Sequence, residues 1–504
     1  MEFTLERRDR ETHRTLLDTV LRREETQEVI VPDPCPDILR VADADGMVLL
    51  ESWEAGEGRL TLTGRCRLSV LYQPEGETGT RHLEISVPLS WETEDPGLTG
   101  DCTLTAQPRL CQAEVRVLNP RKVLVRCEGA LALTVYASQT RELTADGDGP
   151  GLEKRFTTKR VSRTVWVGER SFPFADQVSL PTGRSAAVEV VRSRAAVDQG
   201  EARLIGAKLI WKGKLQVFLL CRGEDGSCWP VRAELPLSQI MEVRGAGEEP
   251  QVEVFPLLSD WSCRLNGEDD GRTASVEGTV LLQAVVREEE TLTLLTDAYS
   301  TAVPLNTQWA SLPVETPVDQ GVRSQSVREV WETPAAVREV LDSRVELYDR
   351  EKEWKGDQLV ITLRGWALVL YTDEEGGLWG GRWPVTVPWS LALPQGADCL
   401  CRWTLTGEPF ASPAAGGVEL RFDLELNYLA IRREELVQIG GLEEGTEEQE
   451  EERPSLILRR REPGEELWDM AKRYRTTVSQ IISANGLEGE ADSTDRLLLI
   501  PGRG

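Results

Sequence analysis

The residues whose types and spacing point to chemistry lie near the C-terminus, and that chemistry is recognition rather than catalysis. Arg459-Arg460-Arg461 precede a turn, and Trp468 follows it. Leu497 and Leu499 lie further on, in a short segment where alternation turns both side chains outward. Arginines beside an exposed tryptophan and leucines are typical of a protein–protein contact. Drift in a surface strand is the competing explanation.

A catalytic or metal centre is not predicted. His13 and His82 are the only histidines, and the ten cysteines lack the ligand spacing of a zinc site. The cysteines are expected to be reduced core residues. A wall hydrolase is disfavoured for the same reason, although a glycosidase pair of carboxylates would leave no spacing signature. We therefore expect a protein that is not an enzyme and holds no cofactor or metal.

The elements that must position the C-terminal residues form a small α+β unit. Apolar side chains recur at i, i+3, i+4 and i+7 across residues 467–474, which predicts a short amphipathic helix. Thr477 followed by Gln480 is a capping box that opens a second helix, and Gly486 ends it in a left-handed turn. Residues 498–500 then alternate as a closing strand, so the predicted order is βααβ.

Bulk properties limit the partners. The chain has 504 residues and a formal net charge of −27, which excludes a DNA-binding body because phosphate neutralisation needs clustered Lys and Arg. Met1 to Arg23 are rich in charge and lack the apolar core of a signal peptide. No stretch approaches the roughly 18 apolar residues of a membrane helix. We expect a cytoplasmic protein with no nucleic-acid partner and no membrane insertion.

The long segment before the tail contains a diverged repeat. Tyr72, Cys221 and Tyr371 occupy the same place in three copies of one motif, 149 and then 150 residues apart. A proline follows each of them at a similar distance, namely Pro88, Pro236 and Pro388. A unit of this length is too long for a solenoid and fits a whole domain.

Each copy is predicted to be β-structure. Apolar and polar residues alternate with period two, which indicates one wet face and one buried face and hence antiparallel sheets packed as sandwiches. A proline beside such a run suits an edge strand, where no ladder N–H is needed. The clearest strands are expected at residues 59–72, 123–136, 276–286, 359–371 and 418–430.

Helix is expected to be sparse in this part of the chain. Glu11–Glu25 is the best candidate, because its leucines and Val20 form one stripe. The predicted organisation is an N-terminal segment at 1–28, β domains at 29–145, 155–300 and 310–437, an acidic linker at 440–454 and a tail domain at 455–502. The linker is expected to stay extended and to decouple the tail from the body, with a charged helical spacer as the alternative.

The tail resembles the LysM family, βααβ modules known mainly for binding glycans that contain N-acetylglucosamine. The resemblance covers residues 455–504 and implies that ligand is read by the loops after the first strand and the second helix. It departs from the family at Glu466, where a small hydroxyl residue is usual, and at Asp495, where glycine is usual. With the outward residues above, the candidate binding surface is Gly464, Glu465, Glu466, Leu467, Trp468, Asn485, Gly486, Leu487, Leu497 and Leu499.

The body resembles the SPOCS domains of spore coat proteins from Firmicutes. Residues Val31-Pro32-Asp33-Pro34-Cys35-Pro36-Asp37-Ile38-Leu39, a following strand and the run GRCRLSVLY from Gly64 carry the resemblance. It implies a mainly β chain of three sandwich-like SPOCS repeats followed by a small α+β LysM domain.

The two resemblances together imply a spore coat morphogenetic adaptor in the mother-cell cytoplasm at the forespore surface. Its LysM domain would dock on a coat ATPase of the basal layer, and its repeats would contact other coat proteins. The alternative partner is peptidoglycan of the cortex or cell wall.

Overall fold

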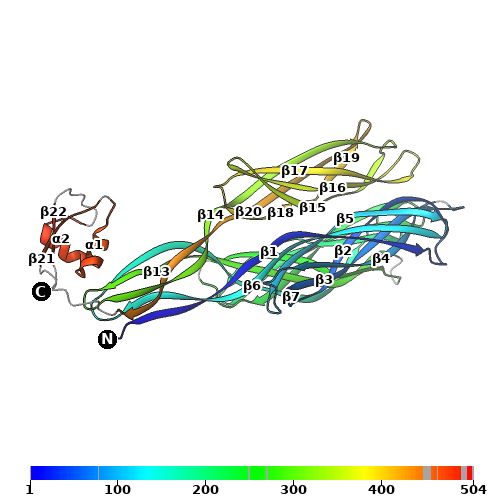
Figure 1. The fold of residues 1–504 in the computed structure, drawn as a ribbon. Coiled ribbons are helices and arrows are strands. Elements are labelled where there is room, and N and C mark those ends of the chain that lie inside the picture. The colour runs from blue at the N-terminus through cyan, green and yellow to red at the C-terminus, as the bar shows by residue number, and fades with distance from the viewer. Residues whose placement is uncertain are drawn as a thin grey trace.

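Long antiparallel strands build an elongated body that carries a small module at one end (Figure 1). The computed structural model describes residues 2–77, 79–247, 250–267, 271–445, 456–462, 464–489 and 497–501. Residues 4–445 are called the body below, and residues 456–501 the module. The prediction of a mainly β chain is confirmed, and the long strands pair in the antiparallel sense that the alternation predicted.

Three segments of the body repeat one order of strands. Each has a long strand, a meander of shorter strands, one or two further strands, and a second long strand that returns beside the first. The first repeat holds β1 (Thr4–Ile30), β2 (Ile38–Gly56), β3 (Arg59–Pro74), β4 (Arg81–Glu94), β5 (Thr103–Asn119) and β6 (Lys122–Asp148). The second holds β7 (Leu152–Ser179), β8 (Ala187–Val197), β9 (Glu201–Ile205), β10 (Lys208–Gly223), β11 (Cys228–Glu242), β12 (Gln251–Leu265) and β13 (Thr273–Ser300). The third holds β14 (Leu305–Glu332), β15 (Glu339–Lys355), β16 (Gln358–Thr372), β17 (Leu378–Ala392), β18 (Asp398–Leu405), β19 (Phe410–Ala414) and β20 (Gly417–Glu444).

The recurring motif marks equivalent strands. Tyr72, Cys221 and Tyr371 lie near the ends of the central meander strands β3, β10 and β16, and all three side chains are buried. The motif prolines lie in β4, β11 and β17, which are edge strands of their sheets, as predicted. The five expected strand segments also lie within strands.

Two sheets of the first repeat share one core. Leu62 and Val70 of β3 pack in the same hydrophobic cluster as Val125 and Leu133 of β6. The third repeat has a similar core between the sheet of β16 and the sheet of β20. The assignment of each repeat to the SPOCS sandwich domains stays a prediction.

The long strands form three hairpin-like pairs, β1–β6, β7–β13 and β14–β20, which run alongside one another toward the module (Figure 1). They share a core to which Leu143 of β6, Val161 of β7, Leu294 of β13 and Leu312 of β14 contribute. Because each pair buries one face against the other two, the three repeats form one body rather than separate beads.

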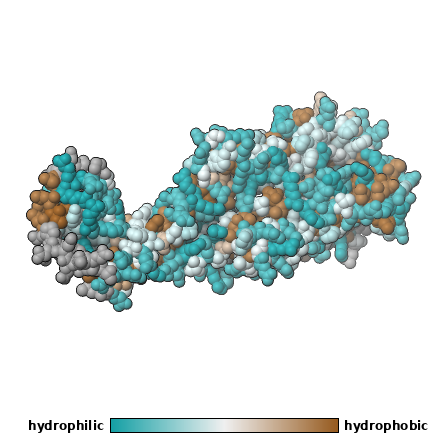
Figure 2. Space-filling model, viewed as in Figure 1, coloured by the Kyte–Doolittle hydropathy of each residue, from teal (hydrophilic) through white to brown (hydrophobic). Residues whose placement is uncertain are grey.

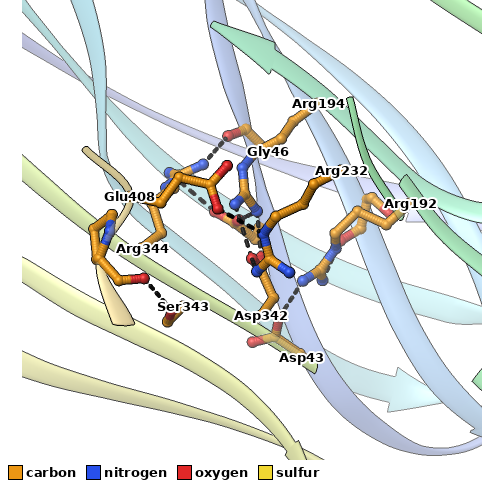
Figure 3. Close-up of polar contacts among 12 residues, drawn as sticks. Asp43, Gly46, Arg192, Arg194, Arg232, Asp342, Ser343, Arg344 and Glu408 are labelled. Atoms are coloured by element: carbon orange, nitrogen blue, oxygen red, sulfur yellow. Dashed lines mark hydrogen bonds and ion pairs between the residues drawn. The ribbon is translucent and has the colours of Figure 1, made fainter. Parts of the chain in front are cut away.

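Charged side chains join the three repeats where their meanders meet (Figure 3). Arg192 of the second repeat contacts Asp43 of the first at 2.7 Å, and Arg344 of the third contacts Asp45 of the first at 3.1 Å. Arg194 of the second repeat donates to Asp342 of the third through both terminal nitrogens of its guanidinium group. Positions 43, 192 and 342 are equivalent in the repeat, being 149 and 150 residues apart.

The expected helix at Glu11–Glu25 is wrong. This segment lies inside β1, whose residues pair with β6 from Thr4↔Asp148 to Ile30↔Lys122. Pairing with β6, a strand more than a hundred residues away, overrides the local helical pattern because it supplies the backbone hydrogen bonds of this segment. Leu16, Leu17 and Leu21 still pack on the core in the extended conformation. Residues 4–28 are therefore part of the first repeat and do not form a separate N-terminal segment.

The strands also shift the other expected boundaries. The second repeat spans 152–300 and the third spans 305–444, so the first residues of the expected acidic linker, 440–444, belong to β20. The rest of that linker, residues 446–454, lies outside the described residues.

Candidate functional site

The module contains the βααβ order that the sequence predicts: β21 (Leu456–Arg460), α1 (Leu467–Tyr474), α2 (Val478–Asn485) and β22 (Leu497–Pro501). Thr477 and Gln480 form the expected capping box of α2, and Gly486 ends that helix with a φ of 59°. Glu466 and Asp469 cap α1 reciprocally. The module's core comprises Leu467, Met470, Ala471, Ile481, Leu498 and Ile500, among others.

The loop before α1 holds three of the candidate residues, and a fourth, Leu467, begins the helix. Gly464 has a φ of +84°, which favours glycine there. The Glu465 carboxylate lies 3.1 Å from Arg459 and 3.6 Å from Arg473, and the Glu466 carboxylate lies 2.5 Å from Arg155 of the body. Both acids are therefore ion-paired within the protein, and Leu467 is buried in the core.

The end of α2 and the loop after it hold three more candidates, Asn485, Gly486 and Leu487. The contacts of Asn485 and Leu487 are structural. The Asn485 side-chain amide donates to the carbonyls of Ile481 at 2.8 Å and Leu499 at 2.6 Å, and its oxygen accepts from the Leu499 N–H at 2.7 Å. Asn485 thereby fastens the closing strand to the end of α2. Leu487 packs in the core, so its expected place on an accessible surface is corrected, as it is for Leu467.

Trp468 requires the largest correction. Its side chain was expected to meet another protein, but it is only 8% exposed because it packs on the body. Its indole N–H donates to Asp297 at 2.7 Å, and its ring meets Tyr299 edge-on with centroids 4.9 Å apart. Lys472 contacts the same Asp297 carboxylate at 2.5 Å.

The module is consequently docked on the end of β13 and is not decoupled from the body. The Tyr299 hydroxyl donates to the carbonyl of Thr476 at 2.9 Å, which adds a contact with the segment between the two helices. Sequence reasoning missed Arg155, Asp297 and Tyr299. Nothing local marks these residues, because their partners lie more than 150 positions further along the chain.

The outward face of the module's two-stranded sheet is apolar. Leu456, Leu458 and Leu497 are 54%, 62% and 59% exposed, and Leu499 is half-buried. Leu458 pairs with Leu499, and Arg460 with Leu497, so these side chains share one face. Figure 2 shows a hydrophobic area on the side of the module turned away from the body. This surface is called the leucine face below.

The sequence predicted half of the leucine face. Leu497 and Leu499 were identified from the phase of the closing strand, whereas Leu456 and Leu458 were missed. The alternation in Leu456-Ile457-Leu458 could have revealed them, since Ile457 turns toward the core and its two neighbours turn outward.

Other kinds of site find no support among the described residues. Within them, no group of three or more His, Cys, Asp or Glu side chains is arranged to hold a metal ion. The two helices of the module are too short to cross a membrane, and the described part of the chain has no helix that could do so.

Comparison with known proteins identifies the module's class. The LysM domain model matches residues 462–491, which include both helices and both candidate loops. The chain therefore carries a LysM domain, a class of module associated with carbohydrate and peptidoglycan binding. Neither the curated proteins nor the solved structures that were searched contain a match to the chain.

Proposed function

We propose that this protein is a non-catalytic adaptor of spore coat assembly, of the SipL type, whose LysM domain docks on an ATPase of the coat basal layer. Its place would be the mother-cell cytoplasm at the forespore surface. The three repeats would act as SPOCS-like domains that contact other coat proteins.

The leucine face is the observation that carries this proposal. Three leucines with more than half of their surface exposed are costly to leave in water, and a cluster of them is typical of a protein contact. Arg460 stands at one end of the face and supplies a charged group for the rim of such an interface.

The candidate loops favour a protein partner over a sugar for a second reason. A glycan site needs polar groups that can exchange water for sugar hydroxyls. Glu465 and Glu466 are held by arginines, and Asn485 is held by backbone groups of the module itself. A sugar would have to break these contacts.

Introduction of a negative charge on the leucine face tests the proposal. We expect Leu458→Glu in the full chain to abolish co-purification with the basal-layer ATPase, because an ionised side chain would be buried unpaired in the interface. Stability should change by less than about 0.5 kcal/mol, since the site is exposed. Leu39→Glu on β2 is the matched control, because Leu39 is 56% exposed and lies on the body. Retained binding by Leu458→Glu would refute the docking surface.

Peptidoglycan binding is the second candidate, and the LysM match itself favours it. Retention of the full chain on purified peptidoglycan, competed by N-acetylglucosamine oligomers and unaffected by Leu458→Glu, would establish this alternative. The adaptor proposal expects no such retention.

A further inference from the structure

A cavity of about 330 Å³ lies where the three repeats meet. Its wall includes equivalent pieces of the three meanders, at residues 46–49, 194–197 and 343–347. A further strand of each repeat completes it, at residues 107–110, 256–258 and 403–405. The volume is within the range of small-molecule sites, which often form at domain junctions.

Most of the wall is apolar. Leu257, Leu347 and Trp403 line the cavity together with Phe218. The Phe218 ring has the guanidinium of Arg194 at 4.4 Å from its centroid and that of Arg232 at 5.4 Å. A ligand in this cavity would therefore meet a hydrophobic surface bordered by cations.

Arginine is the commonest charged residue of the wall, although the protein as a whole is strongly acidic. Four arginines line the cavity against three acids, and those seven residues are Arg109, Arg194, Arg232, Arg344, Asp198, Glu346 and Glu408. Two of the arginines have close partners. Arg194 is held by Asp342, and Arg344 donates to the carbonyl of Gly46 at 3.0 Å (Figure 3). Arg344 also pairs with Asp45.

The other two arginines are held less tightly. Arg109 contacts Glu346 at 3.4 Å, and its side chain is 38% exposed. Arg232 lies 3.0 Å from Glu408, whose own side chain is 56% exposed, and 3.4 Å from Asp342 (Figure 3). A guanidinium group has five N–H donors, so these contacts leave donors at the cavity for a planar anion.

We propose that this cavity binds a small amphipathic anion, with Arg109 and Arg232 holding its acidic end and the apolar wall covering its hydrocarbon part. The site requires all three repeats. It is independent of the LysM domain and of the proposed adaptor function.

Calorimetric titration of the full chain with octanoate tests the proposal, with octanol as the uncharged counterpart. We expect saturable binding of octanoate at one site and much weaker binding of octanol. Arg109→Gln should weaken octanoate binding roughly tenfold or more, because a hydrogen bond to a charged group is lost. Arg116→Gln is the matched control, since Arg116 lies on the same strand with its side chain 71% exposed.

Two further variants make the outcome decisive. Arg232→Gln should act like Arg109→Gln. If Arg232→Gln unfolds the chain because the contact with Asp342 is lost, the octanoate affinity of Arg109→Gln alone tests the proposal. Leu458→Glu should leave octanoate binding unchanged, which separates the cavity from the leucine face. The absence of saturable binding, equal binding of octanol, or an equal loss in Arg116→Gln would overturn the assignment.

Discussion

Two kinds of junction hold the molecule together, and they differ in chemistry. The repeats meet through buried ion pairs such as Arg194 with Asp342, whose carboxylate is only 6% exposed. The LysM domain meets the body through one aromatic pair, Trp468 with Tyr299, and polar contacts with Asp297, whose side chain is 23% exposed. The first junction lies in the buried interior of the body, whereas the second lies at its surface.

The difference indicates what each junction does. Equivalent positions in the repeats carry Asp43, Arg192 and Asp342, so the second repeat differs in charge from the other two at this position. Like charges at all three places would repel. Buried pairs of this kind add little net stability, but they are expensive to break and can specify which element packs where. The module junction instead combines the Trp468–Tyr299 contact with ion pairs that are partly exposed.

Breaking the repeat junction should have the largest effect. We expect Asp342→Ala to lower the free energy of unfolding by about 3–5 kcal/mol, because Arg194 is left buried without its main partner. Urea denaturation followed by tryptophan fluorescence measures the change. Glu353→Ala is the control, since its pair with Lys355 is solvent-exposed and should be worth about 1 kcal/mol or less. A loss of about 1 kcal/mol or less in Asp342→Ala would contradict a role for this ion pair in joining the repeats.

Acid should weaken the same junction in a defined pH window. Burial alone would raise the pKa of Asp45, but Arg344, Arg192 and Arg194 outweigh it and hold the pKa at about 2, below the ordinary value of 3.8. The carboxylate therefore contributes stability that is present above pH 3.8 and is lost as the pH falls through about 2, about 2 kcal/mol in all.

Comparison of the native chain with Asp45→Asn isolates this contribution. Urea midpoints measured from pH 5 to pH 2 should fall less steeply in the variant, because an amide does not titrate. The control is Asp33→Asn, at a fully exposed position, whose urea midpoint should fall with pH as steeply as that of the native chain. Parallel curves for the native chain and Asp45→Asn would exclude Asp45 as the group responsible.

Removing the anchor of the module should have a smaller and local effect. We expect Asp297→Ala to weaken docking by about 1.5 kcal/mol, since the Trp468 indole and Lys472 lose a charged acceptor that is partly exposed. Hydrogen exchange of residues 467–474 should accelerate, while the urea midpoint of the body stays unchanged. Asp260→Ala, an exposed acid of β12, serves as control. Unaltered exchange in Asp297→Ala would mean that Asp297 does not hold the module.

The parts of the fold that follow local rules could be predicted well. Capping by Thr477 and Gln480, the left-handed Gly486 and the helical spacing across residues 467–474 act within one or two turns, so the LysM helices were predicted correctly. Period-two alternation likewise predicted the strands. The same local reasoning failed at Glu11–Glu25, because this segment becomes a strand by pairing with β6, which is distant in the sequence.

The candidate binding residues also include some that a local pattern placed correctly and some that depend on distant contacts. The phase of the closing strand predicted the outward Leu497, which requires only knowledge of the alternation. Trp468 was misplaced because its burial depends on Tyr299 and Asp297, and no spacing rule links residues so far apart.

The sequence by itself determined the repeat, the strand alternation, the class of the C-terminal module and the excess of negative charge, because each depends on residues close together or on a simple count. Only the tertiary structure decided that the three repeats close into one body around complementary charges, that a cavity lies between them, and that the LysM domain is docked. These features arise from contacts between side chains about 150 or more residues apart, which become neighbours only when the long strands have paired.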